Sequence, residues 1–323
     1  MAVVRVIEAG MFTAIQDVGR IGYNSLGVPR SGAADALSLI VGNRLLGNDD
    51  NAAALECTLL GPTLAFDRDC CVSVTGAACA EARVETDAHA QSIEWCSPTP
   101  IKAGDVLTLG RLDGSARAYL CIAGGIDIEP MLGSRATCPH ANLGGLQGRP
   151  LRKNDALPIA EPRSSLRSLS SGLQAWLRDE LRPPVLRIVP SLHTDDFSAE
   201  AIQQLCESAF TVREQSSRIG TRLLGDAIAP PPRVQELDSE PTVEGAIQIT
   251  GDGQAIILGP DRPTTGGYPI AACVIAADLP ALAMLRPRDT VHFEWVSLDQ
   301  ARTIAVTQRA ELDALLPMTE APS

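Results

Sequence analysis

The sequence has few aromatic residues, little lysine and no long apolar run, and each shortage excludes a class of protein. Aromatics make up 3% of the 323 residues, so the core must be built from Leu, Val, Ile and Ala. Lysine occurs only at Lys102 and Lys153, and the formal net charge is −12. This balance argues against nucleic acid as the main partner, because phosphate binding requires a basic patch.

No apolar run approaches the ~18 residues of a membrane span, and the N-terminus lacks the basic start and long apolar stretch of a signal peptide. We therefore expect a cytoplasmic protein with no membrane partner. The nine cysteines are odd in number, form no Cys-x-x-Cys pair and stand partly in apolar runs, which is typical of buried thiols in a reducing compartment. Cys138 and His140 lack a third ligand nearby, so we expect no metal site.

Glycine (27) and proline (23) are spread along the chain, which favours short strands joined by turns. Apolar runs predict strands over residues 3–8, 63–66, 71–74, 106–109, 118–122, 185–189, 245–249, 255–258, 271–275, 291–296 and 303–306. Helices are predicted over residues 35–46, 173–181 and 278–285 and from about Ser198, the last with Ser198 as its N-cap.

One local pattern recurs in both halves of the chain. A basic or glycine-containing turn leads into Asp105, Asp155 and Asp289, and each Asp is followed by a strand-like run. The recurrence indicates related β units. Ser-rich residues 160–184 separate them, so the predicted domains are residues 1–184 and 185–317, followed by a tail at 318–323.

The most distinctive stretch is Asp261-Arg262-Pro263-Thr264-Thr265-Gly266-Gly267-Tyr268-Pro269, which lies between two apolar runs. Its glycines allow a ligand close to the backbone, and successive N–H groups can cradle an anion. Arg262 adds a fork of donors suited to a carboxylate or phosphate. From these residues alone, a binding role and an ordinary surface loop are equally open.

A second segment runs from Gln16 to Asp35 and includes Asp17, Arg20 and Ser31. Ser31 and Asp35 stand at a predicted helix N-terminus, which is a natural anion site, although either residue can simply cap the helix. A third segment, residues 215–222, carries Arg218 and Arg222. Each arginine can bind a substrate or form a structural ion pair.

Together these segments, with Ala123-Gly124-Gly125-Ile126-Asp127 and Leu132-Gly133-Ser134-Arg135, resemble the family of 5-oxoprolinase C subunits over about residues 5–310. The family is also called allophanate hydrolase subunit 2 or the biotin-dependent carboxyltransferase family. The resemblance implies a mainly β fold of two tandem cyclophilin-like β-barrel units with a few short helices. Four positions depart from the family pattern: Pro263 replaces Gln, Ile270 replaces Lys, and Ser217 and Thr221 stand where Asp and an aromatic residue are common.

The resemblance also implies an ATP-dependent hydrolase complex that opens the 5-oxoproline lactam, a small cyclic amide, to L-glutamate. The expected partners are a smaller cyclophilin-like sister subunit and a third catalytic subunit, with ATP as the complex's cofactor. One alternative is the carboxyltransferase half-site of a biotin-dependent urea or amide carboxylase. Biotin would then arrive on a separate carrier, because neither lysine has a Met-Lys-Met-like context. A non-catalytic regulatory subunit is a further alternative.

Lactam opening and carboxyl transfer both require fixed donors beside developing negative charge. We assign catalytic roles to Asp261, Arg262 and Asp35, as bases or oxyanion partners. The predicted substrate-binding residues are Gln16, Asp17, Arg20, Ser31, Arg218, Arg222, Thr264, Thr265, Gly266, Gly267 and Tyr268.

Overall fold

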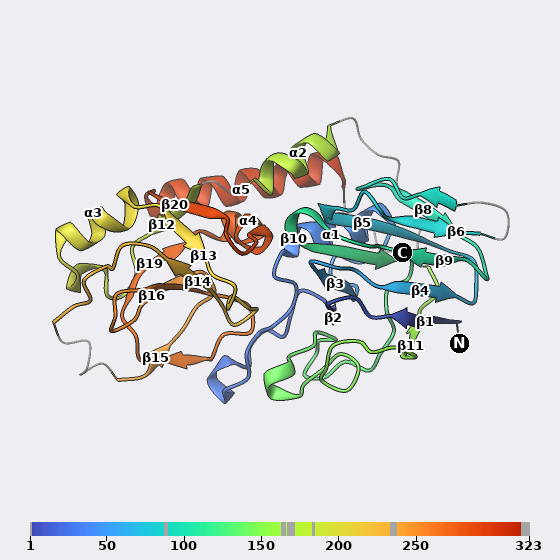
Figure 1. The fold of residues 1–323 in the computed structure, drawn as a ribbon, viewed down its shortest axis with the longest axis horizontal. Helices are drawn as coiled ribbons and strands as arrows, with labels where there is room; N and C mark the ends of the chain where they lie inside the picture. The colour runs from blue at the N-terminus through green and yellow to red at the C-terminus, as the bar shows by residue number, and fades with distance from the viewer. Residues whose placement is uncertain are drawn as a thin grey trace. The chain divides into compact units, whose positions relative to one another are not determined.

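The structure, a computed structural model, describes residues 2–86, 90–162, 166, 172–182, 185–232 and 238–317 (Figure 1). The chain divides into two compact units. Unit 1 contains residues 1–20, 31–179 and 311–323, and unit 2 contains residues 21–30 and 180–310. Strands dominate both units, and five α-helices lie within the described residues.

Unit 1 is built from two antiparallel sheets. The first has the order β11-β1-β4-β9-β6-β7 and the second the order β2-β3-β10-β5-β8. The strands of the first sheet are β1 (Ala2–Glu8), β4 (Thr63–Phe66), β6 (Arg83–Glu85), β7 (Ala90–Ser92), β9 (Val106–Thr108) and β11 (Ala156–Ile159). Those of the second are β2 (Phe12–Gln16), β3 (Ala54–Thr58), β5 (Cys70–Ala78), β8 (Pro98–Ile101) and β10 (Asp113–Ile122).

Both sheets of unit 1 contribute to one apolar core. Val4 and Leu64 from the first sheet and Ile15, Leu55 and Val74 from the second belong to the same buried cluster. Helix α1 (Ala36–Leu45) packs on β5 and β10. The Thr75 hydroxyl donates to the Ser38 carbonyl at 2.7 Å and fixes the helix to the sheet. The N-terminus of α1 is thereby held over the second sheet.

Unit 2 is a closed seven-stranded barrel in the order β12-β19-β16-β17-β14-β13-β20. Its strands are β12 (Val185–Val189), β13 (Phe210–Val212), β14 (Gly220–Leu224), β16 (Ala246–Ile249), β17 (Ala255–Leu258), β19 (Ile270–Val274) and β20 (Thr290–Trp295). The parallel pair β12–β20 completes the ring. A separate two-stranded ribbon pairs β15 (Glu240–Pro241) with β18 (Thr265–Gly266). Phe210 and Phe293 meet inside the barrel with ring centroids 5.6 Å apart.

Four further α-helices lie within the described residues. They are α2 (Leu173–Glu180), α3 (Ala199–Glu207), α4 (Leu279–Met284) and α5 (Leu298–Leu315), with 3-10 turns at Asn24–Leu26, Pro139–Ala141, Thr194–Asp196 and Ala276–Asp278. The predicted cap of α3 is confirmed, because the Ser198 side chain accepts the Ala201 N–H at 3.2 Å. A search of the described residues finds no helix with the length and hydropathy needed to cross a bilayer. All nine cysteines are free thiols.

The predicted mainly β fold with a few short helices is confirmed, and unit 2 is a barrel. Unit 1 differs in detail, since its strands form two sheets rather than one hydrogen-bonded ring. The predicted strand at 303–306 is wrong, because α5 covers it. Ser297 and Gln300 form a reciprocal cap that starts this helix: Gln300 N–H donates to Ser297 Oγ at 3.1 Å, and Ser297 N–H donates to Gln300 Oε1 at 2.8 Å.

The predicted domain limits at 184 and 317 stay a prediction. The compact units differ from them in two segments, since residues 21–30 belong to unit 2 and residues 311–323 to unit 1. Of the expected boundary stretch, residues 163–165, 167–171 and 183–184 lie outside the described part of the chain, as does the predicted tail at 318–323.

The recurring Asp turn has the same geometry in both units. Asp105, Asp155 and Asp289 each accept, on a carboxylate oxygen, the N–H of the residue three positions earlier, at 2.8, 2.7 and 2.7 Å. The residue before each Asp has positive φ: Gly104 at 95°, Asn154 at 72° and Arg288 at 78°. The repeat in the sequence therefore reflects one repeated turn.

This repetition predicts the effect of exchanging the turn residues. Arg288→Gly is expected to raise the free energy of unfolding by about 0.5–1 kcal/mol, because it relieves a left-handed backbone that favours glycine. The exposed Arg288–Glu214 ion pair that it removes contributes little. Gly104→Arg is the matched reverse change. A side chain there meets nothing within 4 Å, so its expected cost of about 1 kcal/mol comes from the backbone alone. Urea denaturation of both variants tests the pair, and equal stabilities would contradict it.

Candidate functional site

The predicted site residues fall into two clusters, one in each compact unit. Gln16, Asp17, Arg20, Ser31 and Asp35 belong to unit 1 and are called the Asp17 cluster. The others belong to unit 2. In the Asp17 cluster, the Ala33 N–H donates to the Asp17 carbonyl at 2.8 Å, so the loop after β2 lies beside the loop before α1.

Asp17 organises this double loop. Its carboxylate accepts the Gly19 N–H at 2.8 Å, the Ser134 hydroxyl at 2.7 Å and the Arg135 N–H at 2.6 Å. The side chain is 2% exposed. Because one buried carboxylate accepts all three hydrogen bonds, the role of Asp17 in the structure is to form this turn. The same hydrogen bonds hold Ser134 and Arg135, which belong to the motif Leu132-Gly133-Ser134-Arg135.

Gln16, Arg20 and Ser31 are also buried within the Asp17 cluster. The Arg20 guanidinium donates to the carbonyls of Met131 and Ala136, so it holds the 131–136 segment in place. Gln16 Nε2 donates to the Thr137 carbonyl at 3.1 Å, while its Oε1 and the Ser31 Oγ are buried without a hydrogen-bond partner. These two atoms have unused hydrogen-bonding capacity, and the substrate-binding role of the cluster stays a prediction.

Asp35 is the N-cap of α1. Its Oδ1 accepts the Ser38 N–H at 2.9 Å, and its own N–H donates to the Tyr119 hydroxyl at 2.8 Å. Tyr119 in turn donates to Glu56 Oε2 at 2.7 Å. Burial raises the pKa of the Asp35 carboxyl from 3.8 to about 7, although the hydrogen bonds from Ser38 oppose the rise. The geometry therefore shows that Asp35 caps α1. A catalytic role for Asp35 stays a prediction.

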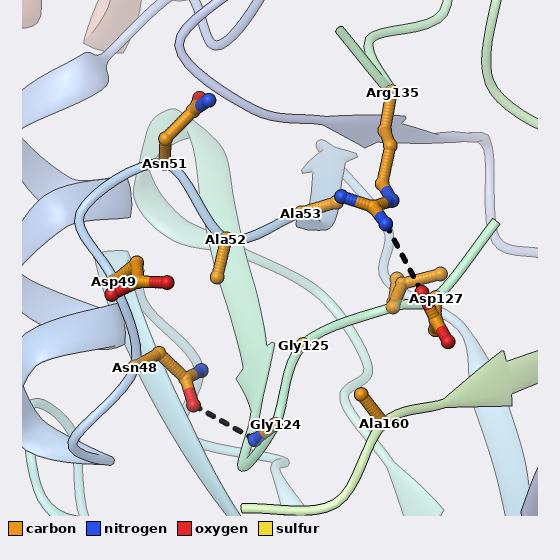
Figure 2. A pocket seen from close by; sticks show the side chains of 11 residues that line it. Asn48, Asp49, Asn51, Ala52, Ala53, Gly124, Gly125, Asp127, Arg135 and Ala160 are labelled. Atoms are coloured by element: carbon orange, nitrogen blue, oxygen red, sulfur yellow. Dashed lines mark hydrogen bonds and ion pairs between the residues drawn. The ribbon is translucent and has the colours of Figure 1, made fainter. Parts of the chain in front are cut away.

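A polar cavity of 280 Å³ lies in unit 1 next to the Asp17 cluster (Figure 2). Arg135 and Asp127 form an ion pair in its wall at 3.0 Å. The Asn51 side chain, also in the wall, accepts the Val18 N–H at 2.9 Å. Residues of the cavity wall thus bind the same loop that carries Asp17.

Two glycines in the turns near this cavity use their amides within the chain. The Gly124 N–H donates to Asn48 Oδ1 at 2.8 Å (Figure 2), and the Gly145 N–H donates to the Arg135 carbonyl at 3.0 Å. A Cβ on Gly124 would lie 2.2 Å from the Ala160 carbonyl oxygen. Close packing of the backbone therefore explains these glycines.

In unit 2, Arg218 and Asp261 form a buried two-point ion pair. Arg218 Nε donates to Asp261 Oδ2 at 2.8 Å and Nη2 donates to Oδ1 at 3.0 Å. The side chains are 6% and 1% exposed. Asp261 follows β17 and Arg218 precedes β14, and the antiparallel pairing of these strands brings the two together. The pair fixes the orientation of the Asp261 carboxylate.

Arg262 follows Asp261 in the chain but has a different environment. It is 7% exposed, and its Nε and Nη1 are buried without a hydrogen-bond partner. Burial lowers the pKa of Arg262, with attraction from Glu244 opposing the shift and repulsion from Arg30 adding to it. Burial also raises the pKa of Glu244, against attraction from Arg262, Arg30 and Arg218. We call Arg30, Arg218, Glu244, Asp261 and Arg262 the arginine cluster.

The rest of the distinctive turn lies at the surface beside the arginine cluster. Thr265, Gly267 and Tyr268 are exposed, and Thr264 and Gly266 are half-buried. Residues 265–266 form β18 of the ribbon with β15. Arg222 is exposed on β14 and is not paired with Asp261 in the structure, unlike Arg218. Arg222 therefore lies apart from the buried cluster.

Sequence reasoning missed Glu244, Arg30 and His193. The buried His193 accepts the Ile270 N–H on Nδ1 at 3.2 Å, and its Nε2 lies 3.3 Å from Glu240 Oε2 in the ribbon. Ile270 itself is 5% exposed and packs in an apolar cluster with Ala246 and Leu258. No local sequence pattern marks His193, because its partners are 77 and 47 positions away in the chain.

Within the described residues, no group of three or more His, Cys, Asp or Glu side chains is placed to hold a metal ion. The chemistry visible in both units is that of buried arginines, carboxylates and hydroxyls. Such groups bind and polarise small amide or carboxylate compounds. The fold and clusters thus define a mainly β protein with buried arginines and carboxylates in each of its two units.

Comparison with known proteins specifies the family. Residues 26–295 match the family model described as "Carboxyltransferase domain, subdomain A and B", and the chain belongs to this family. It is 38% identical over 298 residues to the 5-oxoprolinase C subunit of Escherichia coli K12, covering 92% of each chain. It is 34% identical over 310 residues to the 5-oxoprolinase C subunit of Haemophilus influenzae, covering 96% of each. The family resemblance seen in the sequence is confirmed.

The fold is also found in a much longer protein. The crystal structure of the K. lactis urea amidolyase superposes with a TM-score of 0.84 at 29% identity. The match covers 99% of this chain but only 20% of that one. This chain thus corresponds to one part of the yeast enzyme.

Proposed function

We propose that this chain is a subunit of an ATP-dependent 5-oxoprolinase that opens the lactam of 5-oxoproline to L-glutamate. The observation that carries the proposal is that the alignments cover nearly all of this chain and nearly all of each relative. The 5-oxoprolinase C subunits of two bacteria align with nearly the whole of this chain and over nearly their own whole length. By contrast, the urea amidolyase of Lachancea kluyveri aligns over only 18% of its length.

The arginine cluster supplies the chemical groups that lactam opening requires. Attack on an amide carbonyl places negative charge on its oxygen, and preorganised donors stabilise that charge. Arg262 has buried donors without protein partners, and Arg218 holds Asp261 in one orientation. We assign Asp261 and Arg262 to contact with the substrate, and the exposed turn Thr264–Tyr268 to its entry side.

The argument for a catalytic role of Asp35 is the raised pKa of its carboxyl group. A carboxyl whose pKa is about 7 exchanges its proton near neutral pH, as general acid–base catalysis requires. Its side chain is fully buried at the start of α1, which favours a structural cap. We therefore propose Asp35 as a catalytic residue only in second place, after Asp261.

The subunit naming of the relatives implies partner chains. We propose a smaller cyclophilin-like sister subunit and a third catalytic subunit as those partners. ATP would be consumed by the assembled cytoplasmic complex, and the reaction would be a hydrolysis. These assignments extend the resemblance to the 5-oxoprolinase subunits and await reconstitution.

A second candidate function is half of a carboxyl-transfer site in a biotin-dependent urea or amide carboxylase. The match of 99% of this chain to part of a yeast urea amidolyase favours it. In that reaction the same donors would stabilise an oxyanion while a nitrogen attacks. Biotin would be carried by a separate protein, because the sequence context of Lys102 and Lys153 differs from that of a biotinylated lysine.

Avidin separates the two candidates. The purified complex of this chain with its partner subunits is assayed for glutamate release from 5-oxoproline and ATP, with and without excess avidin. Lactam opening is expected to be insensitive to avidin. Carboxylation of urea by the same complex with a biotinylated carrier protein, abolished by avidin and unaccompanied by glutamate release, would establish the alternative instead.

A further inference from the structure

Arg218 and Arg262 are both buried arginines of the arginine cluster, and they differ in their hydrogen-bond partners. Arg218 has both carboxylate oxygens of Asp261 within 3.0 Å. Arg262 is equally buried, yet its Nε and Nη1 have no hydrogen-bond partner. Native proteins pair nearly all buried polar groups, and an unpaired buried cation is costly. An arginine kept in this state is typical of a position that a ligand completes.

The backbone holds Arg262 firmly in this position. Its N–H donates to the Gly259 carbonyl at 3.2 Å, and Gly259 packs against the Arg218 carbonyl. On the other side, Thr242 N–H donates to the Thr264 carbonyl at 3.0 Å, and the Thr242 hydroxyl donates to the Pro263 carbonyl. The unpaired guanidinium is thus a feature of an anchored loop.

Within the arginine cluster, Asp261 is engaged by Arg218 and not by Arg262. Arg30, Arg218 and Arg262 are opposed by Asp261 and Glu244, and Asp261 is already engaged by Arg218. Glu244 attracts Arg262, but the Nε and Nη1 atoms of Arg262 remain without a partner. A bound anion would supply the partner that Arg262 lacks, and a carboxylate is such a group.

We propose that Arg262, supported by Arg30, binds the carboxylate of the substrate and thereby selects a cyclic amide that carries a carboxylate over one that does not. This assignment rests on the proposed function, because 5-oxoproline combines a lactam with one carboxylate. Arg262 is then a specificity-determining residue. Asp261, oriented by Arg218 in the neighbouring position, faces the reacting part of the molecule.

The guanidinium suits this task through its geometry. It is planar and permanently charged, and its unpaired Nε and Nη1 face different edges of that plane, so each can donate to an oxygen of a bound anion. A lysine would retain the charge but offer a single point of contact. Arg262→Lys is therefore expected to bind the carboxylate more weakly than the wild type and more strongly than Arg262→Gln.

The test uses the assembled complex and two lactams. Arg262→Gln is expected to raise the KM for 5-oxoproline about 10–100-fold, because hydrogen bonds to a charged group are lost. The KM for ATP and any turnover of 2-pyrrolidinone, which lacks the carboxylate, are expected to be the same as in the wild type. Arg302→Gln is the matched control at an exposed arginine of unit 2 and should resemble the wild type. The assignment would be overturned if Arg262→Gln had the KM of the wild type for 5-oxoproline, or if its KM for ATP rose instead.

Direct binding separates this inference from the proposed function. Calorimetric titration of the complex with 5-oxoproline, 2-pyrrolidinone and inorganic phosphate is repeated with Arg262→Gln. If Arg262→Gln loses binding of 5-oxoproline but not of the other two ligands, the carboxylate site is supported, even in a complex that releases no glutamate. Glutamate release by a complex in which Arg262→Gln binds 5-oxoproline normally would retain the function and refute the site. A wild-type complex that binds phosphate in preference to 5-oxoproline would also refute it.

A stability measurement distinguishes a ligand-binding arginine from a structural one. The unpaired cation contributes little to folding, so Arg262→Met is expected to leave the Tm of the ligand-free chain unchanged or higher. A structural arginine replaced in the same way would lower the Tm. A clear fall in Tm for Arg262→Met, accompanied by equal losses for both lactams, would show that Arg262 acts on the fold.

Discussion

Replacing Arg218 with Met is expected to lower the free energy of unfolding by about 3–5 kcal/mol, which is the cost of leaving a buried charge without its partner. Asp261 has a 1% exposed side chain and accepts both of its short charged hydrogen bonds from Arg218. Without Arg218 the carboxylate must find water or take up a proton. Either response disturbs the loop that carries Arg262.

A double-mutant cycle tests this expectation. Asp261→Leu alone should be destabilising to a similar degree, and Arg218→Met combined with Asp261→Leu should cost clearly less than the sum of the single changes. Arg222→Met is the control, since its exposed side chain predicts a change within about 0.5 kcal/mol. Additive single effects, measured by chemical denaturation, would show that the two side chains are not coupled.

The second large effect concerns the pH dependence that Asp35 gives to folding. The pKa of Asp35 rises from 3.8 to about 7 in the folded protein. Between these values the folded chain retains a proton that the unfolded chain has released. Stability therefore falls as pH rises from about 4 to about 7, by roughly 4 kcal/mol in total, and is constant above that range.

Asp35→Asn removes this component while keeping a good N-cap, because Asn and Asp cap helices about equally well. The stability of the variant relative to the wild type is expected to improve by roughly 4 kcal/mol between pH 4 and pH 8. Asp226→Asn, at an exposed carboxylate, serves as the control and should parallel the wild type. Parallel curves for Asp35→Asn and the wild type across this range would show that Asp35 is ionised in the folded chain.

Local sequence signals predicted much of the fold. The Asp turns at residues 105, 155 and 289 depend on contacts within four residues, so their recurrence was visible in the sequence. The same holds for the Ser198 cap of α3. The strand predicted at 303–306 failed because the capping pair Ser297 and Gln300, which begins α5, was overlooked.

The site was less predictable because its contacts are distant in sequence. Arg218 and Arg262 look alike in the sequence, and only the pairing of Arg218 with Asp261, 43 positions away, separates them. Glu244 lies near Arg262 because the loop around Thr242 is hydrogen-bonded to Thr264, and no sequence motif predicts this contact. The buried chain from Asp35 through Tyr119 to Glu56 joins residues 84 and 63 positions apart.

The most direct test of the proposed function is subunit omission. Partner subunits are purified with and without this chain, and glutamate release from 5-oxoproline and ATP is measured for both preparations. We expect release from the complete complex only, and its restoration when the purified chain is added back. Equal release by partner subunits that lack this chain, or none from a fully assembled complex, would contradict the assignment.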